Sequence, residues 1–298
     1  MTLPDSIPDY GTEAKSIDGQ LNILVAGKNG NLVDSMIFAN VDTVKRKITL
    51  VSIPRDLYYN GRKINAVYYF YGMDELKRAL STVTGYKIDK YILIDMYSFI
   101  DVIDLIGGID VHLDQPVIDP TYKTFDGGQW GTLYYRAGDY HLNGTQALRL
   151  ARTRHTTSDF ARAERQQMIL GALQDKAKKF GFGDAAALTK IAQGVLARTE
   201  TDISLAEAIS YYFRYQDFEI SRGHVLSSGN VLESKYTGDL KKAEENCDTV
   251  TGTQQVDEAK QAECESILQG EYILLPKNDD WNSVRWFFHQ IIEGKADA

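Results

Sequence analysis

Long apolar runs, a basic charge surplus and nucleotide-binding loops are all missing from this chain of 298 residues. No stretch approaches twenty consecutive apolar residues and no basic, then apolar leader opens the chain, so we expect no part of it to cross a membrane. The net charge of −8 disfavours nucleic acid, because duplex binding needs a broad basic face. No G-x-x-x-x-G-K-[ST] loop and no G-x-S-x-G elbow is present, which argues against an ATPase or a serine hydrolase.

Cysteine is equally scarce, with Cys247 and Cys264 in a polar, acidic stretch from Lys241 to Glu265. They lack C-x-x-C spacing and a neighbouring histidine, which favours a disulfide closing a small loop over a zinc or redox site. Such a bridge would restrict the unfolded chain by about 3 kcal/mol and would imply an oxidising, extracytoplasmic location. The alternative is two free surface thiols in a cytosolic protein.

The composition that remains is that of a globular protein, with 43% apolar and 25% charged residues. The length fits one α/β domain, which we expect over residues 21–298. Residues 1–20 hold Pro4, Pro8, Gly11 and Gly19 and predict an irregular lead-in that follows a membrane anchor outside this chain.

Short apolar runs alternate with amphipathic stretches, the pattern of a layered α/β fold. The expected strands are 22–27, 36–41, 48–53, 91–95 and 109–113. The expected helices are 74–84, 98–106 and 159–180. Residues 114–138 predict a long excursion with a hairpin, and excursions of this length in compact domains are usually functional.

Five arginines lie within seventeen residues of an otherwise acidic chain. They are Arg149, Arg152, Arg154, Arg162 and Arg165. Because the guanidinium fork matches phosphate oxygens in pairs and keeps its proton, this cluster predicts a phosphate or pyrophosphate pocket. Arg162 and Arg165 fall at a predicted helix start, where the free N–H groups also favour an anion. Arg152 and Arg154 would share one face if their stretch is extended. The alternative is a solvated helix start paired with its own acidic residues.

Two further motifs supply chemistry that a phosphate pocket needs. Ser52-Ile53-Pro54-Arg55-Asp56 ends a predicted strand with proline, which releases Arg55 and Asp56 at the end of the sheet, where α/β proteins bind ligands. Asp34 and Ser35 begin a neighbouring strand. Their oxygen atoms are ligands that Mg²⁺ prefers beside a pyrophosphate.

Together these motifs resemble the LytR-CpsA-Psr family. The matching segments, in order, are Asp34-Ser35-Met36, Ser52-Ile53-Pro54-Arg55-Asp56, Lys63-Ile64-Asn65-Ala66, Gly107-Gly108-Ile109-Asp110-Val111, Leu142-Asn143-Gly144 with Ala147-Leu148, Arg152-Thr153-Arg154 and Asp159-Phe160-Ala161-Arg162-Ala163-Glu164-Arg165-Gln166-Gln167. The resemblance covers about residues 20–220, and Glu271 to Ile292 is similar to the family's closing strand and helix.

The resemblance implies an αβα sandwich around a central mixed sheet, with an apolar tunnel for a polyprenyl chain. It implies a membrane-anchored, extracytoplasmic phosphotransferase of the bacterial cell-wall zone. Family members move a glycopolymer from an undecaprenyl-pyrophosphate carrier to peptidoglycan, or to a surface protein, and form a phosphodiester.

The resemblance also assigns roles by position. The residues it places on the pyrophosphate and in catalysis are Arg55, Arg152, Arg154 and Arg162. Arg165 and Gln166 would support pyrophosphate binding within the same motif. Asp34 would hold Mg²⁺, and Asp56 is a weaker candidate for positioning or activation.

The chain departs from the family pattern in the segment between Gly27 and Val33, where members often carry an acidic residue and an arginine. Here Asn29 stands for the acidic residue, Lys28 supplies some positive charge, and the loop is short. This departure leaves open a non-catalytic binder of cell-wall lipid intermediates. A pyrophosphatase-like hydrolase of prenyl pyrophosphates also stays open, because it would use the same arginine cluster with water as the acceptor. The cysteine-bearing segment at about 240–268 lies outside the family motifs and is predicted to be an insertion.

Overall fold

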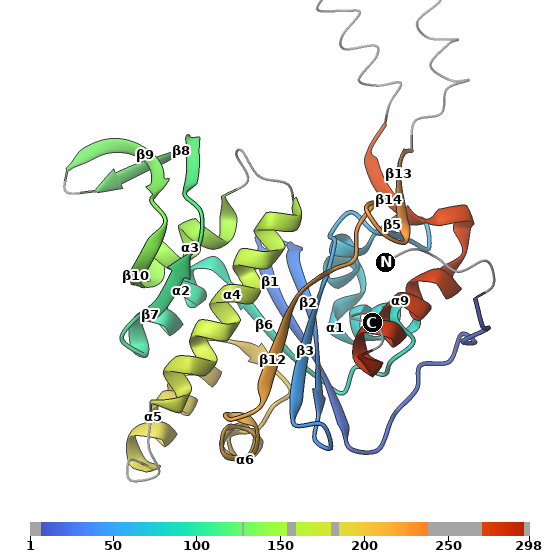
Figure 1. Ribbon diagram of the computed structural model, residues 1–298, viewed down its shortest axis with the longest axis horizontal. Coiled ribbons are helices and arrows are strands. Elements are labelled where there is room, and N and C mark those ends of the chain that lie inside the picture. Colours follow the sequence, from blue (N-terminus) through green and yellow to red (C-terminus); the bar gives the residue numbers. More distant parts are fainter. Residues whose placement is uncertain (1–6, 127, 154–158, 180–184, 238–269, 295–298) are drawn as a thin grey trace, which may run out of the picture.

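A mixed sheet of six strands forms the centre of the molecule (Figure 1). The computed structural model describes residues 7–126, 128–153, 159–179, 185–237 and 270–294. The strand order is β11-β6-β1-β2-β3-β12. The strands are β1 (Gln20–Asn29), β2 (Leu32–Asp42), β3 (Lys47–Ile53), β6 (Lys90–Asp95), β11 (Glu200–Thr201) and β12 (Glu219–Val225).

The directions of the strands bring the ends of several of them to one edge. β2 is antiparallel to β1 and β3, whereas β6 is parallel to β1 and β12 is parallel to β3. The start of β2 therefore lies beside the ends of β1 and β3, with β6 and β12 ending at the same edge. The candidate residues Asp34, near the start of β2, and Arg55 and Asp56, which follow β3, therefore meet at this edge.

Helices cover both faces of the sheet, with α1 and α9 on one side and α4 on the other (Figure 1). The helical segments are η1 (Ile64–Ala66), α1 (Val67–Thr84), α2 (Met96–Leu105), α3 (Gly144–Arg152), α4 (Asp159–Lys178), α5 (Ala185–Leu196), α6 (Leu205–Tyr215), η3 (Lys277–Asp279) and α9 (Trp281–Glu293). The predicted αβα sandwich is confirmed. Among the described residues, no helix is both long and apolar enough to cross a bilayer.

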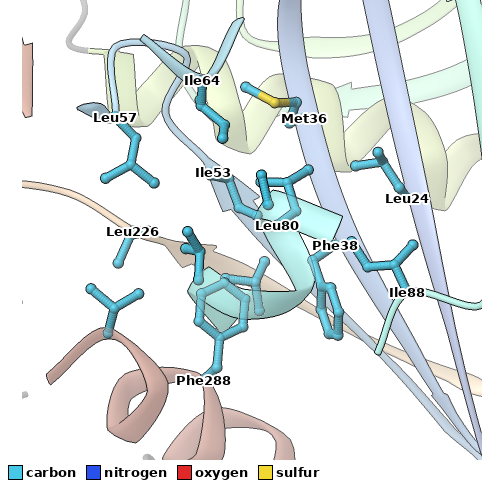
Figure 2. Close-up of a cluster of buried hydrophobic side chains, with 14 of the residues drawn as sticks. Leu24, Met36, Phe38, Ile53, Leu57, Ile64, Leu80, Ile88, Leu226 and Phe288 are labelled. Carbon is cyan, nitrogen blue, oxygen red and sulfur yellow. The ribbon is translucent and has the colours of Figure 1, made fainter. Parts of the chain in front are cut away.

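The largest apolar core lies between the sheet and the α1/α9 layer (Figure 2). Phe38 of β2 meets Phe288 of α9 edge to face, with the ring centroids 5.5 Å apart. Leu24 of β1 and Leu80 of α1 are fully buried beside them. Because alternate residues of a strand face opposite sides, burying every second residue of β1 fixes its register against this layer.

Smaller two-stranded sheets surround the central one. They are β4 (Tyr58–Tyr59) with β5 (Arg62–Lys63), β7 (Ile109–Leu113) with β10 (Gly138–Leu142), β8 (Val117–Asp126) with β9 (Gln129–Tyr135), and β13 (Leu232–Tyr236) with β14 (Tyr272–Pro276). The predicted hairpin is confirmed as β8–β9, which projects beyond α3 (Figure 1). A second core of apolar side chains joins β7, β8, β9 and β10 to α3 and α4.

The structure differs from the sequence-based expectation at the start of α1. The apolar periodicity predicted a helix from Asp74, whereas α1 begins at Val67. Gly72, with φ 81° and ψ −177°, interrupts the helical backbone and separates an aromatic first turn from the amphipathic remainder, so the periodicity begins only after it.

Several predictions fall on residues outside the described ranges. They concern Arg154, the cysteines Cys247 and Cys264 with their pairing, the whole insertion at about 240–268, and residues 1–6 of the lead-in. These remain predictions.

Candidate functional site

Asp34 and Arg55 form the centre of the site. Asp34 lies near the start of β2 and Arg55 follows the end of β3, and the two strands pair up to Met36 and Ile53. An Arg55 Nη1 hydrogen bond to Asp34 Oδ1 measures 2.9 Å. The two residues that the sequence selected from different motifs are thus in direct contact, and both side chains are partly exposed.

A β-bulge at Asp34 sets this carboxylate apart from its strand. Gly27 pairs with Ser35 and Lys28 pairs with Val33, so the pairing of β1 with β2 skips Asp34. Such bulges redirect a side chain next to a functional site. The expected short loop is confirmed, because Asn29 pairs with Leu32 and leaves only two residues in the turn.

Asp56 is held between two cations. Lys63 Nζ lies 3.0 Å from Asp56 Oδ1, and Arg55 Nε lies 3.6 Å from Asp56 Oδ2. Charges therefore alternate along the rim from Asp34 to Lys63. Lys63 belongs to one of the motifs, but the sequence assigned it no role. Its contact with Asp56 depends on the folding of the β4–β5 ribbon and cannot be read from the sequence.

Gln166 of α4 joins the site to α3. Ser35 donates a hydrogen bond of 2.7 Å from Oγ to Gln166 Oε1. Gln166 Nε2 donates to the carbonyl oxygen of Ala151 at 3.3 Å. A single amide therefore connects the start of β2, beside Asp34, with the last turn of α3, which carries Arg152.

Arg165 is buried and supports the end of α3. It is 5% exposed, and its guanidinium donates to the carbonyl oxygens of Leu150 at 3.1 Å and Thr153 at 2.6 Å. Burial, and then the neighbouring charge of Arg162, lowers the pKa of Arg165. Arg162 is half-buried close by. The two arginines therefore differ in exposure, although their spacing in α4 is helical.

The five arginines do not form one uniform cluster. Arg149 makes a paired contact with Asp126 of the β8–β9 hairpin, at 2.7 and 2.9 Å, and this pairing lowers the pKa of Asp126. Arg152 is the exposed last residue of α3, so the extended stretch considered for Arg152 and Arg154 does not include Arg152. Arg154 lies outside the described residues. Of the other described members, Arg152 is exposed and Arg162 is half-buried, so both keep side-chain area at the surface.

A buried threonine and aspartate fix the chain next to Arg152; Thr153 lies in the Arg152-Thr153-Arg154 motif, but no motif signals its partner Asp119. Thr153 Oγ1 donates to Asp119 Oδ2 at 2.6 Å, and the two residues are 1% and 3% exposed. Asp119 Oδ1 also accepts from the backbone N–H of Thr121 at 3.0 Å and of Tyr122 at 2.9 Å. The hairpin arm is thereby tied to the end of α3.

Lys28, at the end of β1, contacts an acidic partner that is remote in sequence. Its Nζ lies 3.9 Å from Glu200 Oε2 and 5.6 Å from the centre of the Tyr68 ring. Tyr68 donates its hydroxyl hydrogen to the same Glu200 oxygen at 2.7 Å. Burial, together with this contact, raises the pKa of Tyr68 to about 12. The positive charge of Lys28, which is expected to compensate for the arginine of the family pattern, is therefore shared with Glu200.

The oxygen donors at Asp34 and Ser35 suit a metal that arrives with phosphate. Within the described ranges, no group of three or more His, Cys, Asp or Glu could hold a metal ion. Mg²⁺, however, usually takes one or two carboxylates together with substrate phosphates and water. Ser35 gives its proton to Gln166, which leaves its oxygen lone pairs available. The residues present fit such an ion.

A hollow of about 510 Å³ lies elsewhere, on the β7–β10 sheet. Its lining includes Asp110, His112, Asp139, His141 and Asp175. Both histidines are exposed and paired with carboxylates, His112 with Asp139 at 2.7 Å and His141 with Asp110 at 2.6 Å. None of the predicted site residues lines this hollow. We therefore place the site at the sheet edge that carries Asp34, because of the charged groups that meet there and not because of the shape of the surface.

Comparison with known proteins identifies the family. The LytR_cpsA_psr family matches residues 7–255. Polyisoprenyl-teichoic acid–peptidoglycan teichoic acid transferase TagV of Bacillus subtilis (strain 168) is 34% identical over 204 residues, which cover 65% of this chain and 51% of that protein. TagU of the same description from a Bacillus cereus strain is 30% identical over 173 residues, 54% of each chain. This chain thus spans about half the length of these curated relatives.

The crystal structure of B. subtilis TagV has the same fold. It superposes with a TM-score of 0.67 at 25% sequence identity, covering 93% of this chain and 99% of that chain. The ordered motifs, the αβα sandwich and a family match over most of the length agree, and the chain belongs to the LytR_cpsA_psr family.

Proposed function

We propose that this protein is an extracytoplasmic phosphotransferase. It moves a glycopolymer from a polyisoprenyl-pyrophosphate carrier to peptidoglycan, or to a surface protein, and forms a phosphodiester. The observation that carries the proposal is the contact of Asp34 with Arg55 at the sheet edge, linked through Ser35 and Gln166 to the α3 end that bears Arg152. The names of TagV and TagU, which describe transfer of teichoic acid from polyisoprenyl to peptidoglycan, support it.

The chemistry requires stabilisation of charge rather than a strong base. An acceptor hydroxyl oxygen attacks the phosphorus next to the glycan, the bond to the bridging oxygen breaks, and polyisoprenyl phosphate leaves, taking up the hydroxyl proton on its phosphate. Charge develops on the phosphate oxygens, where positioned arginines are most effective. Arg55, Arg152 and Arg162 supply this charge, and Arg154 is predicted to join them.

Asp56 serves this site by positioning. Its two carboxylate oxygens face Lys63 and Arg55, so both are engaged by cations before an acceptor hydroxyl arrives. The contact with Arg55 Nε keeps the guanidinium on the rim beside Asp34. Arg165 likewise acts through Arg152, because it holds the backbone on both sides of that residue.

Asp34 and Ser35 are the residues that would hold Mg²⁺. When bound, the ion would neutralise charge on the pyrophosphate oxygens. Arg55 and the metal would then share the Asp34 carboxylate. The link from Ser35 to Gln166 would keep this part of β2 in place relative to the cationic end of α3.

An apolar strip on the α4 side of the sheet suits the polyisoprenyl chain. Ile23 and Val25 of β1 and Ile92 and Ile94 of β6 lie on one face, since Val25 pairs with Ile92 and Gly27 with Ile94. These side chains are only half-buried, whereas their neighbours on the α1/α9 side are buried. Ser35 pairs with Gly27 and so continues the same face toward the proposed pyrophosphate site. We propose that the predicted tunnel follows this strip.

The test is Mg²⁺-dependent release of polyisoprenyl phosphate from a lipid-linked glycopolymer, with and without peptidoglycan. We expect Asp34→Ala and Arg152→Ala each to reduce the rate by about 10²- to 10³-fold, the usual cost of removing one stabilising group. Arg149→Ala is the matched control, because Arg149 lies one turn away in α3 and contacts Asp126. Equal loss in the control would contradict the assignment.

The same assay separates the other two functions. Release that does not depend on peptidoglycan would favour a pyrophosphatase-like hydrolase with water as the acceptor. Tight, arginine-dependent lipid binding without release would favour a non-catalytic binder, for which the Lys28–Glu200 contact is the structural argument.

A further inference from the structure

Three consecutive aromatic residues are exposed in the first turn of α1. Tyr69, Phe70 and Tyr71 are 54%, 58% and 57% exposed. Single exposed apolar residues are common, but a contiguous group of large rings marks a binding surface. In a regular helix, consecutive side chains diverge by about 100°, so three successive rings project in different directions. We call these three residues, with Arg62, the aromatic platform.

The rings of the aromatic platform nevertheless touch. The Tyr69 and Phe70 centroids are 5.0 Å apart, and those of Phe70 and Tyr71 are 6.2 Å apart. The guanidinium carbon of Arg62 lies 4.9 Å from the Phe70 centroid and 4.8 Å from that of Tyr71. Cation–π contacts of this kind hold the rings in place before any ligand arrives, which lowers the entropy cost of binding.

Gly72 separates the platform from the rest of α1. Its φ of 81° is in the region that favours glycine, and a Cβ built there would meet no atom within 4 Å. The glycine is therefore required by backbone conformation and not by close packing. Beyond it, Leu76 and Leu80 are fully buried in the core, so the large rings that face solvent come before Gly72.

The platform adjoins the proposed site at two points. Arg62 precedes Lys63, which holds Asp56. Tyr69 follows Tyr68, which contacts Glu200 beside Lys28. The platform thus lies one residue along the chain from each of these contacts, so a ligand on the rings would lie near the sheet edge where transfer is proposed.

We propose that the aromatic platform binds the saccharide chain of the acceptor, close to the acceptor hydroxyl that receives the phosphate. This inference rests on the proposed function and deepens it. A pyranose ring has an apolar C–H face that stacks on aromatic rings and a polar rim that seeks hydrogen bonds. Polar groups for this rim flank the rings in the chain, namely the exposed Asn60 and Asp74 and the half-buried Arg62.

The charge around the platform disfavours the other obvious occupant, a membrane surface. Anionic headgroups attract clusters of lysine and arginine near an interfacial aromatic group. Here, Asp74 and Glu75 follow the platform in α1, Glu75 is paired with Arg78, and Glu200 is paired with Lys28. The charges around the rings are therefore balanced and do not form the basic cluster that an anionic lipid surface requires, whereas an uncharged or weakly charged glycan is compatible with them.

Direct binding of soluble peptidoglycan glycan strands, released by an amidase that leaves the saccharide chain intact and measured by calorimetry without any donor lipid, tests the proposal. We expect Tyr69→Ala and Phe70→Ala each to weaken binding by about tenfold, as for loss of one stacking aromatic contact. Phe125→Ala and Trp130→Ala are the matched controls, because these hairpin rings are also exposed and also 5.0 Å apart. We expect them to bind like the parent.

Three results would overturn the proposal. The first is unchanged affinity for the strands in both platform variants, and the second is an equal loss of affinity in the hairpin variants. The third comes from co-sedimentation with anionic vesicles: platform variants that no longer sediment with the vesicles but still bind the strands would show that the platform binds lipid. Thermal unfolding of each variant controls for folding. Strand binding is measured without the donor lipid, so it tests this inference alone. Release of polyisoprenyl phosphate tests the proposed function. In a transfer assay, the platform variants should raise the acceptor concentration for half-maximal rate by about the same tenfold.

Discussion

Replacing Arg165 with methionine should destabilise the protein and weaken the site that it supports. Arg165 is 5% exposed, and its guanidinium donates to the carbonyl oxygens of Leu150 and Thr153, which lie on either side of Arg152. Methionine keeps much of the apolar stem and removes both donors. Two carbonyl oxygens in a buried environment would then lose their partner.

The size of the effect follows from these contacts. A hydrogen bond to a charged group contributes about 1.5–3 kcal/mol. Two such bonds set an upper range of about 3–6 kcal/mol, from which the cost of burying the guanidinium is subtracted. That cost is real, since burial lowers the pKa of Arg165. We therefore expect Arg165→Met to lower the free energy of unfolding by about 2–4 kcal/mol.

Urea unfolding at neutral pH, followed by circular dichroism, measures this change as a lower midpoint at unchanged slope. Arg214→Met is the control, because Arg214 is an exposed arginine of α6 and surface substitutions usually stay within about 0.5 kcal/mol. Arg165→Lys should recover part of the loss, since an ammonium can serve one carbonyl. A loss below about 1 kcal/mol in Arg165→Met would refute the role given to these two hydrogen bonds.

Three further changes test other contacts. Lys63→Met removes one of the two cations that contact Asp56, so that only Arg55 remains. It should slow release of polyisoprenyl phosphate by about tenfold in steady-state assays, and an unchanged rate would contradict the positioning role. Thr153→Val removes a buried hydroxyl donor and should lower the urea midpoint by the equivalent of about 2 kcal/mol, so an unshifted midpoint would count against that bond. The pKa of Glu207 is lowered from 4.5 to about 2, mainly by its hydrogen bond with Lys90. The folded pKa lies below the unfolded one, so this stability is present above pH 4.5 and lost as the pH falls toward 2. Glu207→Gln should therefore make the melting temperature less sensitive to pH in this window, and equal slopes would reject the linkage.

The sequence predicted the central strands and the ligand edge because both depend on local patterns. Apolar runs locate β1, β2 and β3, and a proline after Ile53 marks where β3 ends. Asp34 and Arg55 could be chosen because each lies at a strand end within a motif. Their contact then follows from antiparallel pairing.

The different contacts of the arginines could not be predicted, because they depend on partners that are distant along the chain. Arg149 contacts Asp126 of the hairpin, and Arg165 is buried against carbonyls. In the sequence both look like Arg152. Asp119 and Glu200 were missed for the same reason, since neither lies in a motif and each meets its partner only through tertiary folding.

The residue that the β1–β2 pairing skips is also the one on which the chemistry is proposed to depend. The pairs on either side, Gly27 with Ser35 and Lys28 with Val33, close around Asp34 without using it. The pairing of β1 with β2 therefore does not depend on the Asp34 side chain, and a variant at this position should reach the native state with the β1–β2 hairpin intact. Activity and foldability are thus separable at Asp34, so a loss of turnover there can be attributed to chemistry.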